Sequence, residues 1–250
     1  MPEVSRRSMI GATMAILPAT AWAASGDPVV TTRSGRIRGT REAGLQVFRG
    51  VRYGQDSGLR RFQAPVAPEH WRDIRPATAY APSCPQRARQ DATSEDCLFL
   101  NIWTPGTERG ARRPVMLYIH GGAYSNGSVV DPLNDGRHLA AQDVVVVTVN
   151  HRLNALGYLY LARLDPRFAD SGNVGQLDLV LALQWVRDNI ASFGGDPANI
   201  LVFGQSGGGA KIATMMAMPA AKGLFHRAIT MSGQQVTASG PLNASRRTAA

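Results

Sequence analysis

Four compact apolar runs, separated by glycine-rich turns and helix-like stretches, constrain the fold of this chain most strongly. They are CLFLNIW (97–103), PVMLYIH (114–120), DVVVVTVN (143–150) and NILVFG (199–204). Each run is nearly continuously apolar instead of alternating, which is typical of strands buried on both faces. Such strands usually form parallel sheets, with helices in the right-handed connections. The chain is therefore predicted to have an α/β fold with a mostly parallel central sheet flanked by helices.

The segments around these runs supply the other expected elements. The clearest helix is NVGQLDLVLALQWVRDNIASF (173–193), which should end at Gly194 and, being apolar almost all round, should be buried. Residues 29–49 carry three glycines between short β-branched and aromatic pieces, which predicts a hairpin or meander that caps the main sheet. RAITMSG (227–233) is the last expected strand.

Length, composition and charge favour one globular domain without a nucleic-acid partner. The 250 residues are 44% hydrophobic and contain no internal repeat, so one sizeable core is expected. The formal net charge is +9, but it is carried almost entirely by arginines scattered along the chain. A nucleic-acid footprint would gather basic residues into a patch with interleaved aromatics, so a solvated basic surface is the favoured interpretation.

Residues 1–23 resemble an export signal peptide. A pair, Arg6 and Arg7, precedes a short apolar stretch and the small-residue end AWA, which predicts cleavage after Ala23. The paired arginines favour the twin-arginine type. A retained membrane anchor is the weaker alternative, because the apolar stretch is too short to span a bilayer and Pro18 interrupts it. We therefore expect an exported protein, periplasmic or secreted, without a stable membrane anchor.

Cys84 and Cys97 are the only cysteines. Export would place them where a disulfide persists, and the proline- and arginine-rich loop between them has little else to hold it. A bridge closing about 14 residues would contribute roughly 3 kcal/mol in the loop-entropy model. The disulfide is favoured, and two free thiols are the alternative.

Ser206 is the candidate nucleophile. Residues 203–210 read FGQSGGGA, so Gly204, Ser206 and Gly208 form a G-x-S-x-G pattern directly after an apolar run and before the helix-compatible AKIATMMAM. A sharp strand-to-helix turn needs glycine on both sides of the serine, because neighbouring Cβ atoms would clash there. Alone, the pattern also fits a flexible loop, but its strand–turn–helix context favours a catalytic serine.

A second glycine-rich turn strengthens this interpretation. YIHGGAY (118–124) also follows an apolar run, and backbone N–H groups in such a turn can stabilise a developing oxyanion. The alternatives are an ordinary tight turn or a phosphate-binding nest. The nest is disfavoured because the lysine and hydroxyl of a P-loop are absent.

Several motifs together resemble the type B carboxylesterase and lipase family, which includes the cholinesterases. SEDCLFLNIW (94–103) and FGQSGGGA (203–210) look like its two diagnostic motifs. Further matches follow in family order: HGGAY, NHRLNALGYL from Asn150, GNVGQLD from Gly172 and FGGDPANI from Phe193. The resemblance covers nearly all of residues 29–233 and implies an α/β-hydrolase fold, with residues 24–250 as the N-terminal portion of one such domain.

The resemblance also implies roles for single residues. Ser206 matches the nucleophile of a serine carboxylesterase, and the N–H groups of Gly122, Ala123 and Gly207 match the oxyanion hole. Gly207 stands where many members have alanine. Cys84 and Cys97 match the first disulfide of the family. Two further pairs match structural ion pairs: Arg61 with Glu95, and Arg152 with Asp178. The resemblance implies no metal or diffusible cofactor. The expected partner is a small-molecule ester, and the sequence indicates no specific protein partner.

The chain departs from the family pattern in two places. The loop PQRARQDATSED (85–96) lacks the tryptophan with which cholinesterases face a quaternary ammonium, so a choline ester is an unlikely substrate. The 44 residues after Ser206 contain no acidic residue, although family order places the acid and then the histidine downstream.

None of the five histidines occupies the position of the catalytic histidine. They are His70, His120, His138, His151 and His226, and each is interpreted as structural. We therefore expect negligible turnover from residues 1–250 alone, which would lack the triad acid and base. The alternatives to an esterase are a non-catalytic binding homologue and an inactive truncated product.

Overall fold

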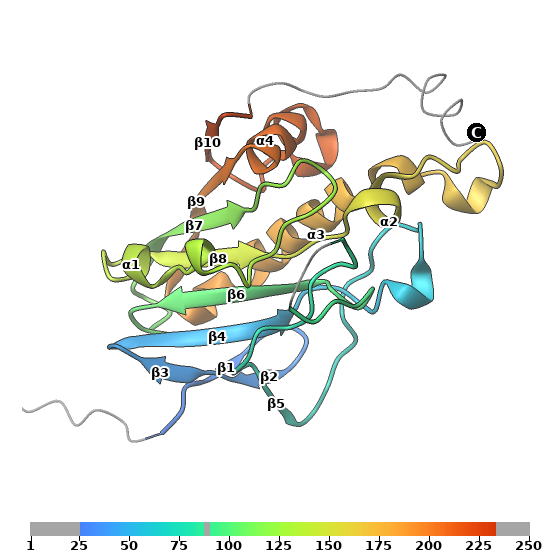
Figure 1. The fold of residues 1–250 in the computed structure, drawn as a ribbon. Coiled ribbons are helices and arrows are strands. Elements are labelled where there is room, and N and C mark those ends of the chain that lie inside the picture. Colours follow the sequence, from blue (N-terminus) through green and yellow to red (C-terminus); the bar gives the residue numbers. More distant parts are fainter. Residues whose placement is uncertain (1–25, 88–90, 234–250) are drawn as a thin grey trace, which may run out of the picture.

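The computed structural model describes residues 26–87 and 91–233 (Figure 1). The predicted signal peptide lies outside the described residues. Seven strands form the main sheet in the order β10-β9-β7-β8-β6-β4-β3. Their bounds are β3 (Thr40–Glu42), β4 (Leu45–Arg52), β6 (Phe99–Thr104), β7 (Arg113–Ile119), β8 (Val145–Val149), β9 (Gly195–Gln205) and β10 (Arg227–Met231).

The main sheet is mixed, which corrects one expectation from the sequence. β10, β9, β7 and β8 are mutually parallel, but β6 pairs antiparallel with both β8 and β4. The apolar run at 97–103 was expected to join the parallel set. The connection from β6 to β7 (105–112) contains no helix, and it is shorter than the dozen or more residues of a parallel crossover. β6 is nevertheless buried because the sheet is covered on both faces, so an all-apolar composition indicates burial and not strand direction.

The N-terminal strands divide between two sheets. β1 (Val29–Thr31), β2 (Arg36–Arg38) and β5 (Ile74–Pro76) form a small separate sheet. β3 and β4 form the expected hairpin, and its turn at Ala43 and Gly44 has φ of 48° and 81°. This hairpin extends the edge of the main sheet instead of capping it, because β4 pairs with β6.

Helices cover both faces of the sheet. They are α1 (Arg137–Ala140), α2 (Asn154–Tyr158), α3 (Val174–Asn189) and α4 (Gly207–Ala217). Short 3₁₀ turns occur at Gly58–Arg60, Pro132–Asn134, Pro166–Phe168, Ser171–Asn173, Ile190–Phe193 and Pro219–Ala221. α3 covers most of the helix expected at 173–193; it ends at Asn189, and the 3₁₀ turn Ile190–Phe193 continues the chain to Gly194, whose φ is 77°. Within the described part of the chain, no helix is long and apolar enough to cross a membrane.

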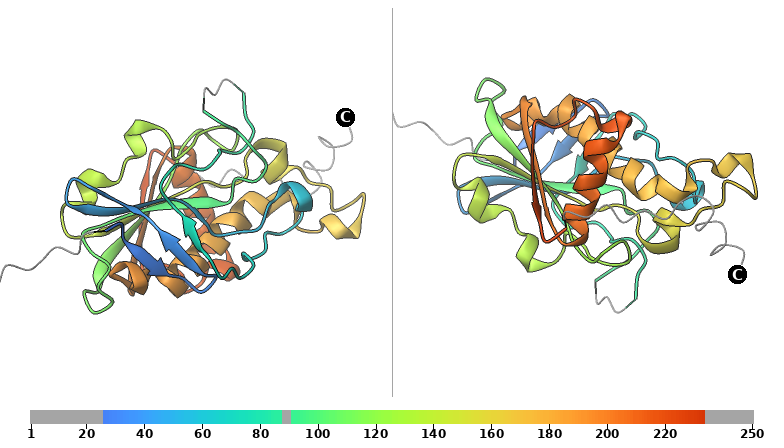
Figure 2. Two further views of the ribbon diagram at one scale, coloured as in Figure 1. Left: turned by 90° about the horizontal axis from the view of Figure 1, so that it is seen from below. Right: turned by 90° about the horizontal axis from the view of Figure 1, so that it is seen from above.

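Two apolar clusters lie on opposite faces of the main sheet, and alternate side chains of its strands belong to one or the other. α3 and α4 lie over one face of the main sheet and α1 over the other (Figure 2). Val145 and Val147 of β8 belong to the large cluster beneath α3, whereas Val146 joins Trp103 and Ala140 in a small cluster beneath α1. Successive side chains of a strand point to opposite faces, so β8 can be completely buried only because both faces are covered.

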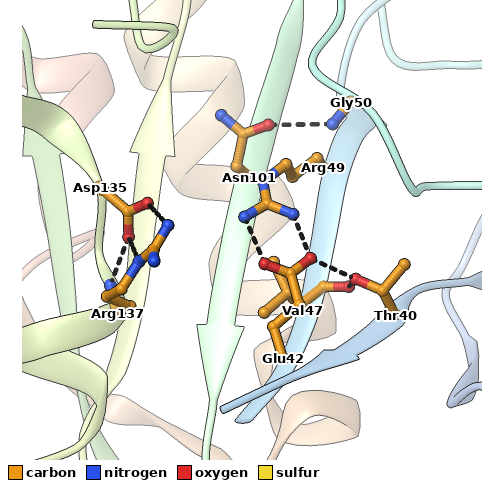
Figure 3. Close-up of polar contacts among 8 residues, drawn as sticks. All are labelled: Thr40, Glu42, Val47, Arg49, Gly50, Asn101, Asp135 and Arg137. Atoms are coloured by element: carbon orange, nitrogen blue, oxygen red, sulfur yellow. Dashed lines mark hydrogen bonds and ion pairs between the residues drawn. The ribbon is translucent and has the colours of Figure 1, made fainter. Parts of the chain in front are cut away.

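Polar side chains fix a bulge where β4 meets β6. The register shifts between Phe48 and Val51, and Gly50 there has φ of 71°. The Asn101 side chain of β6 accepts a hydrogen bond from Gly50 N at 2.9 Å, while Arg49 forms an ion pair with Glu42 of β3 (Figure 3). The Gly50 N–H, which the bulge removes from the ladder of strand hydrogen bonds, is therefore still paired where β4 bends.

A buried ion pair joins β8 to α3. Arg152 follows β8, and its guanidinium donates to both carboxylate oxygens of Asp178, with Nη2 to Oδ1 at 2.7 Å and Nε to Oδ2 at 2.9 Å. Nη1 also donates to Gln63 O at 2.8 Å. The two side chains are only 3% and 0% exposed. The other expected pair, Arg61 with Glu95, is present but more exposed.

We predict that Asp178→Asn lowers the free energy of unfolding by about 3–5 kcal/mol, because it leaves the buried Arg152 charge without its partner. Urea unfolding followed by circular dichroism measures this. The control is Asp165→Asn, which breaks the exposed pair with Arg167 and should change the free energy of unfolding far less. Equal small losses for the two variants would contradict the structural role of the buried pair.

Candidate active site

Parallel pairing of two central strands brings the two glycine-rich turns together. In the register of β7 with β9, Ile119 lies opposite Gly204. Parallel strands end at the same edge of a sheet, so the turn after Ile119 and the turn after Gln205 lie side by side. Such an edge, at the carboxyl ends of the strands, is where open α/β folds bind ligands.

Ser206 has the strained backbone expected of a sharp strand-to-helix turn. Its φ and ψ are 54° and −120°, outside the regions that L-residues ordinarily occupy. Hydrogen bonds hold this conformation from two sides: Ser206 N donates to Met231 O at 2.7 Å, and Ala210 N donates to Ser206 O at 3.0 Å. The side chain is partly exposed and does not cap α4. The strain therefore keeps the hydroxyl clear of the helix that follows it.

The glycines around Ser206 are needed because α4 begins against the end of β7. A Cβ atom on Gly208 would lie 2.0 Å from Ile119 O, and one on Gly204 would lie 2.7 Å from the same oxygen. Both distances are far below van der Waals contact. The turn can accordingly approach β7 only without side chains at these two positions.

The turn after β7 packs directly on Ser206 and Gly207. A Cβ atom on Gly121 would lie 3.4 Å from Ser206 Cβ, and one on Gly207 would lie 2.6 Å from Ala123 N. Gly122 and Ala123 adopt positive φ of 93° and 51°. The structure thus brings together all four residues that the sequence assigned to nucleophile and oxyanion hole, although it does not test those roles.

Gln86 fixes the far end of this turn, a contact that sequence reasoning missed. Its side-chain amide accepts from Gly127 N at 2.7 Å and donates to Gly127 O at 2.9 Å. The same amide nitrogen donates to Cys84 O at 3.0 Å. The side chain of Gln86 therefore holds the 127 end of the 120–127 turn through hydrogen bonds to the backbone of Gly127, for which a sequence pattern gives no signal.

Lys211 is the second residue that sequence reasoning did not place. It lies in α4, is 0% exposed, and its ammonium donates to Ala123 O at 2.6 Å. Burial lowers the pKa of Lys211 to about 7. Lys211 lies five residues after Ser206, which does not fit the spacing of an S-x-x-K dyad, but a lysine within the apolar helix GGGAKIATMMA marks this position as unusual.

The five histidines lie in different surroundings. His226 Nδ1 accepts a hydrogen bond from Ile200 N at 3.1 Å, which places it away from the Ser206 end of β9. The rings of His120 and His151 stack with centroids 4.7 Å apart, and burial holds the pKa of His151 well below its usual value. His70 and His138 are exposed on other segments. The structural roles expected of the five histidines stay a prediction.

The two cysteines lie together in the core. Both are buried free thiols, and the Cys84 side chain is hydrogen-bonded to Cys97. Leu153 N also donates to Cys84 Sγ at 3.2 Å. The disulfide stays a prediction, and its two partners are adjacent as it requires.

A hollow of about 660 Å³ opens beside the 120–127 turn. Its lining includes Gly121, Gly122 and Gln205, polar residues such as Gln86 and Asp131, and the larger side chains of Tyr118, His120 and Leu133. The hollow therefore reaches the residue before Ser206, and a small molecule held there would lie next to the two glycine-rich turns.

Comparison with known proteins identifies the same family over most of the chain. The family model described as the carboxylesterase family matches residues 26–249. The para-nitrobenzyl esterase of Bacillus subtilis is 46% identical over 219 residues, which cover 84% of this chain and 44% of that protein. The fumonisin B1 esterase of Sphingopyxis macrogoltabida is 36% identical, over 90% of this chain and 43% of that protein.

Solved structures agree. The crystal structure of a carboxylesterase from Geobacillus stearothermophilus at pH 6.2 has a TM-score of 0.83 and 44% identity, covering 88% of this chain and 47% of that one. An esterase of Clostridium hathewayi described as hydrolysing aliphatic aromatic polyesters has a TM-score of 0.79 and 48% identity, covering 82% and 43%. The chain spans less than half the length of the relatives it matches.

The lowered pKa of Lys211 predicts a specific pH dependence of stability. Between about pH 7 and pH 10 the unfolded chain holds a proton on Lys211 that the folded chain has lost, so stability rises with pH there. The buried charge should therefore make wild type less stable than Lys211→Met at pH 7. Urea unfolding should show this gap closing by about 2 kcal/mol between pH 7 and pH 9.

Lys222 supplies the control, since it is the only other lysine and is exposed. Lys222→Met should follow the wild-type pH profile. A gap between wild type and Lys211→Met that stays constant from pH 7 to pH 9 would refute the lowered pKa.

Proposed function

The chain belongs to the carboxylesterase family, and on that premise we propose that the protein is a carboxylic-ester hydrolase whose nucleophile is Ser206. The single observation that carries the proposal is the geometry of Ser206. Its strained backbone lies at the carboxyl edge of the parallel strands, with the 120–127 turn packed against it. The Ser206 hydroxyl would attack the ester carbonyl, the alcohol would leave, and water would then hydrolyse the acyl enzyme.

The proposed oxyanion hole consists of the N–H groups of Gly122, Ala123 and Gly207. Gly207 N is the first amide of α4, so the helix leaves it without an intrahelical acceptor, and the helix dipole adds a partial positive charge there. The close approach of Ala123 to Gly207 supports a shared site for one oxygen atom. Donors fixed before the reaction stabilise the developing charge without reorganising.

Activation of Ser206 requires a base, and we propose that the triad acid and histidine are not among residues 1–250. Support comes from the histidine positions: the Nδ1 atom of His226 hydrogen-bonds Ile200 N, and His120 and His151 stack on one another. A serine hydroxyl without a positioned base is a weak nucleophile at neutral pH. No metal or cofactor is part of this mechanism.

The substrate is proposed to be a small-molecule ester without a quaternary ammonium group. Two of the relatives are named as esterases for different compounds, para-nitrobenzyl in one case and fumonisin B1 in the other, so the class of substrate proposed here is the ester. The lining of the hollow beside the 120–127 turn includes Arg87 and Asn134, which supports a polar substituent on the ester. Tyr118 and His120 also line it, but the positive charge of Arg87 in the same hollow disfavours a quaternary ammonium.

We further propose that residues 1–23 direct export and that Cys84 and Cys97 form a disulfide in the exported protein. The paired Arg6 and Arg7 support the first proposal. The adjacency of the two buried thiols supports the second, since a disulfide needs its partners in contact.

Ser206→Ala tests the proposed function in the complete gene product. We expect kcat on p-nitrophenyl butyrate to fall at least about a thousandfold, because attack by the serine hydroxyl is lost while binding persists. The control is Ser192→Ala, which replaces a serine that precedes β9 and therefore lies at the end of this strand opposite to Ser206. Full activity of Ser206→Ala would refute the proposal, and the fragment 1–250 should show no comparable Ser206-dependent turnover.

The exported protein should carry both proposed processing events. Its intact mass should correspond to a chain that begins at Ala24, and it should rise by two hydrogens on reduction. Cys84→Ser is the matched control and should show no such rise. Recovery of exported protein that begins at Met1, or of two thiols that alkylate without reduction after denaturation, would contradict these proposals.

A further inference from the structure

Lys211 is buried where a charge is costly. It is one of only two lysines among 27 basic residues, and it is 0% exposed between neighbours such as Ile212 and Met215 of α4. Within the described residues it forms no ion pair; the titratable groups near it are the buried His151, stacked on His120, and Tyr124, whose ring centroid lies 5.2 Å from Nζ. Methionine or leucine would fill the same volume without desolvating an ammonium, so packing alone does not explain a lysine here.

The ammonium is directed at one atom of the 120–127 turn. Lys211 Nζ donates to Ala123 O at 2.6 Å, and the amine keeps N–H donors for this bond in either protonation state. The backbone of Lys211 is itself fixed, because Gln176 Nε2 of α3 donates to Lys211 O at 3.1 Å. A rigid pair of helices therefore holds the donor that reaches the turn.

Ala123 needs such support. Its φ of 51° lies in the left-handed region, where the Cβ atom of an L-residue crowds the following carbonyl oxygen. Ala123 is also exposed, so burial of its own side chain does not offset this strain. The neighbouring residue is held separately, since Asn154 N donates to Tyr124 O at 2.6 Å.

Gly207 permits the approach that Lys211 secures. A Cβ atom on Gly207 would lie 2.3 Å from Ala123 O and 2.6 Å from Ala123 N. An alanine at this position would push Ala123 away from α4. Glycine at 207 and lysine at 211 therefore act on the same residue from the same helix.

We propose that Lys211 is a positioning residue that holds Ala123 against Gly207, so that the Ala123 N–H points at the ester carbonyl oxygen. This inference rests on the proposed oxyanion hole at Gly122, Ala123 and Gly207. Lys211 touches no substrate; it acts through the Ala123 carbonyl. Losing the hydrogen bond would let the turn relax toward ordinary φ, which misdirects one oxyanion donor while leaving Ser206 in place.

The experiment compares Lys211→Met, Lys211→Gln and wild type in the complete gene product. Methionine keeps the volume and removes the donor, and glutamine keeps a shorter donor. We expect Lys211→Met to lower kcat about ten- to a hundredfold with KM changed less than threefold, because one oxyanion donor is misplaced and not deleted. Lys211→Gln should fall between Lys211→Met and wild type.

A transition-state analogue separates positioning from general structure. A trifluoromethyl ketone adds to the serine and places an oxyanion in the hole, so its Ki should rise in Lys211→Met by the same factor by which kcat/KM falls. Ile212→Val is the control: it removes a buried methylene from the same helix and should leave kcat and Ki within twofold. Gly207→Ala should reproduce the Lys211→Met kinetics by displacing Ala123.

The outcomes distinguish this inference from the proposed function. Unchanged kcat and Ki in Lys211→Met, with turnover still dependent on Ser206, would overturn the role of Lys211 alone. Turnover that survives Ser206→Ala would overturn the proposed function. If Lys211→Met and Lys211→Gln both fail to fold, the ammonium supports the whole fold and a role confined to the turn is wrong. A loss above about ten-thousandfold with a changed pH profile would instead make Lys211 the base.

Discussion

The parallel pairing of β7 with β9 is the constraint on which the rest of the site depends. With Ile119 opposite Gly204, both strands end at one edge and deliver their turns to the same place. The distance between the turns is set by the absence of side chains, since a Cβ atom on Gly208 would lie 2.0 Å from Ile119 O. Backbone packing at this density leaves the Ser206 side chain partly exposed and places backbone amides around it, which is the arrangement an acyl-transfer site requires.

Strained backbone and buried charge are concentrated at this edge, and the surrounding fold offsets their cost. Ser206 and Ala123 both have positive φ, and each is held by hydrogen bonds from a different element. The ion pair of Arg152 with Asp178 ties the end of β8 to α3, and Gln176 ties α3 to α4 at Lys211. These polar contacts link the helices beneath the site into one framework, so a change in any of them reaches the two turns through short, rigid connections.

Much of this arrangement was predictable from the chain. The helix at 173–193 and the strands around the G-x-S-x-G turn form as their patterns indicate, because apolar periodicity and glycine placement are local properties. The direction of β6 was not predictable from its composition, since burial on both faces gives the same apolar run in either direction. The hairpin at β3 and β4 was recognised, but whether it capped or extended the sheet depended on a partner 50 residues away.

The sequence by itself determined the order and spacing of the motifs, and therefore that Ser206 stands in a strand–turn–helix context with glycine on either side. It also contained the resemblance from which the positions of Gly122, Ala123 and Gly207 were read. Only the tertiary structure decided that Ala123 approaches Gly207, that Gln86 clamps the same turn and that Lys211 reaches the Ala123 carbonyl. The physical reason is that motifs record constraints between residues close along the chain, whereas the acceptor of a buried ammonium 88 residues away is fixed only when strands pair and helices pack.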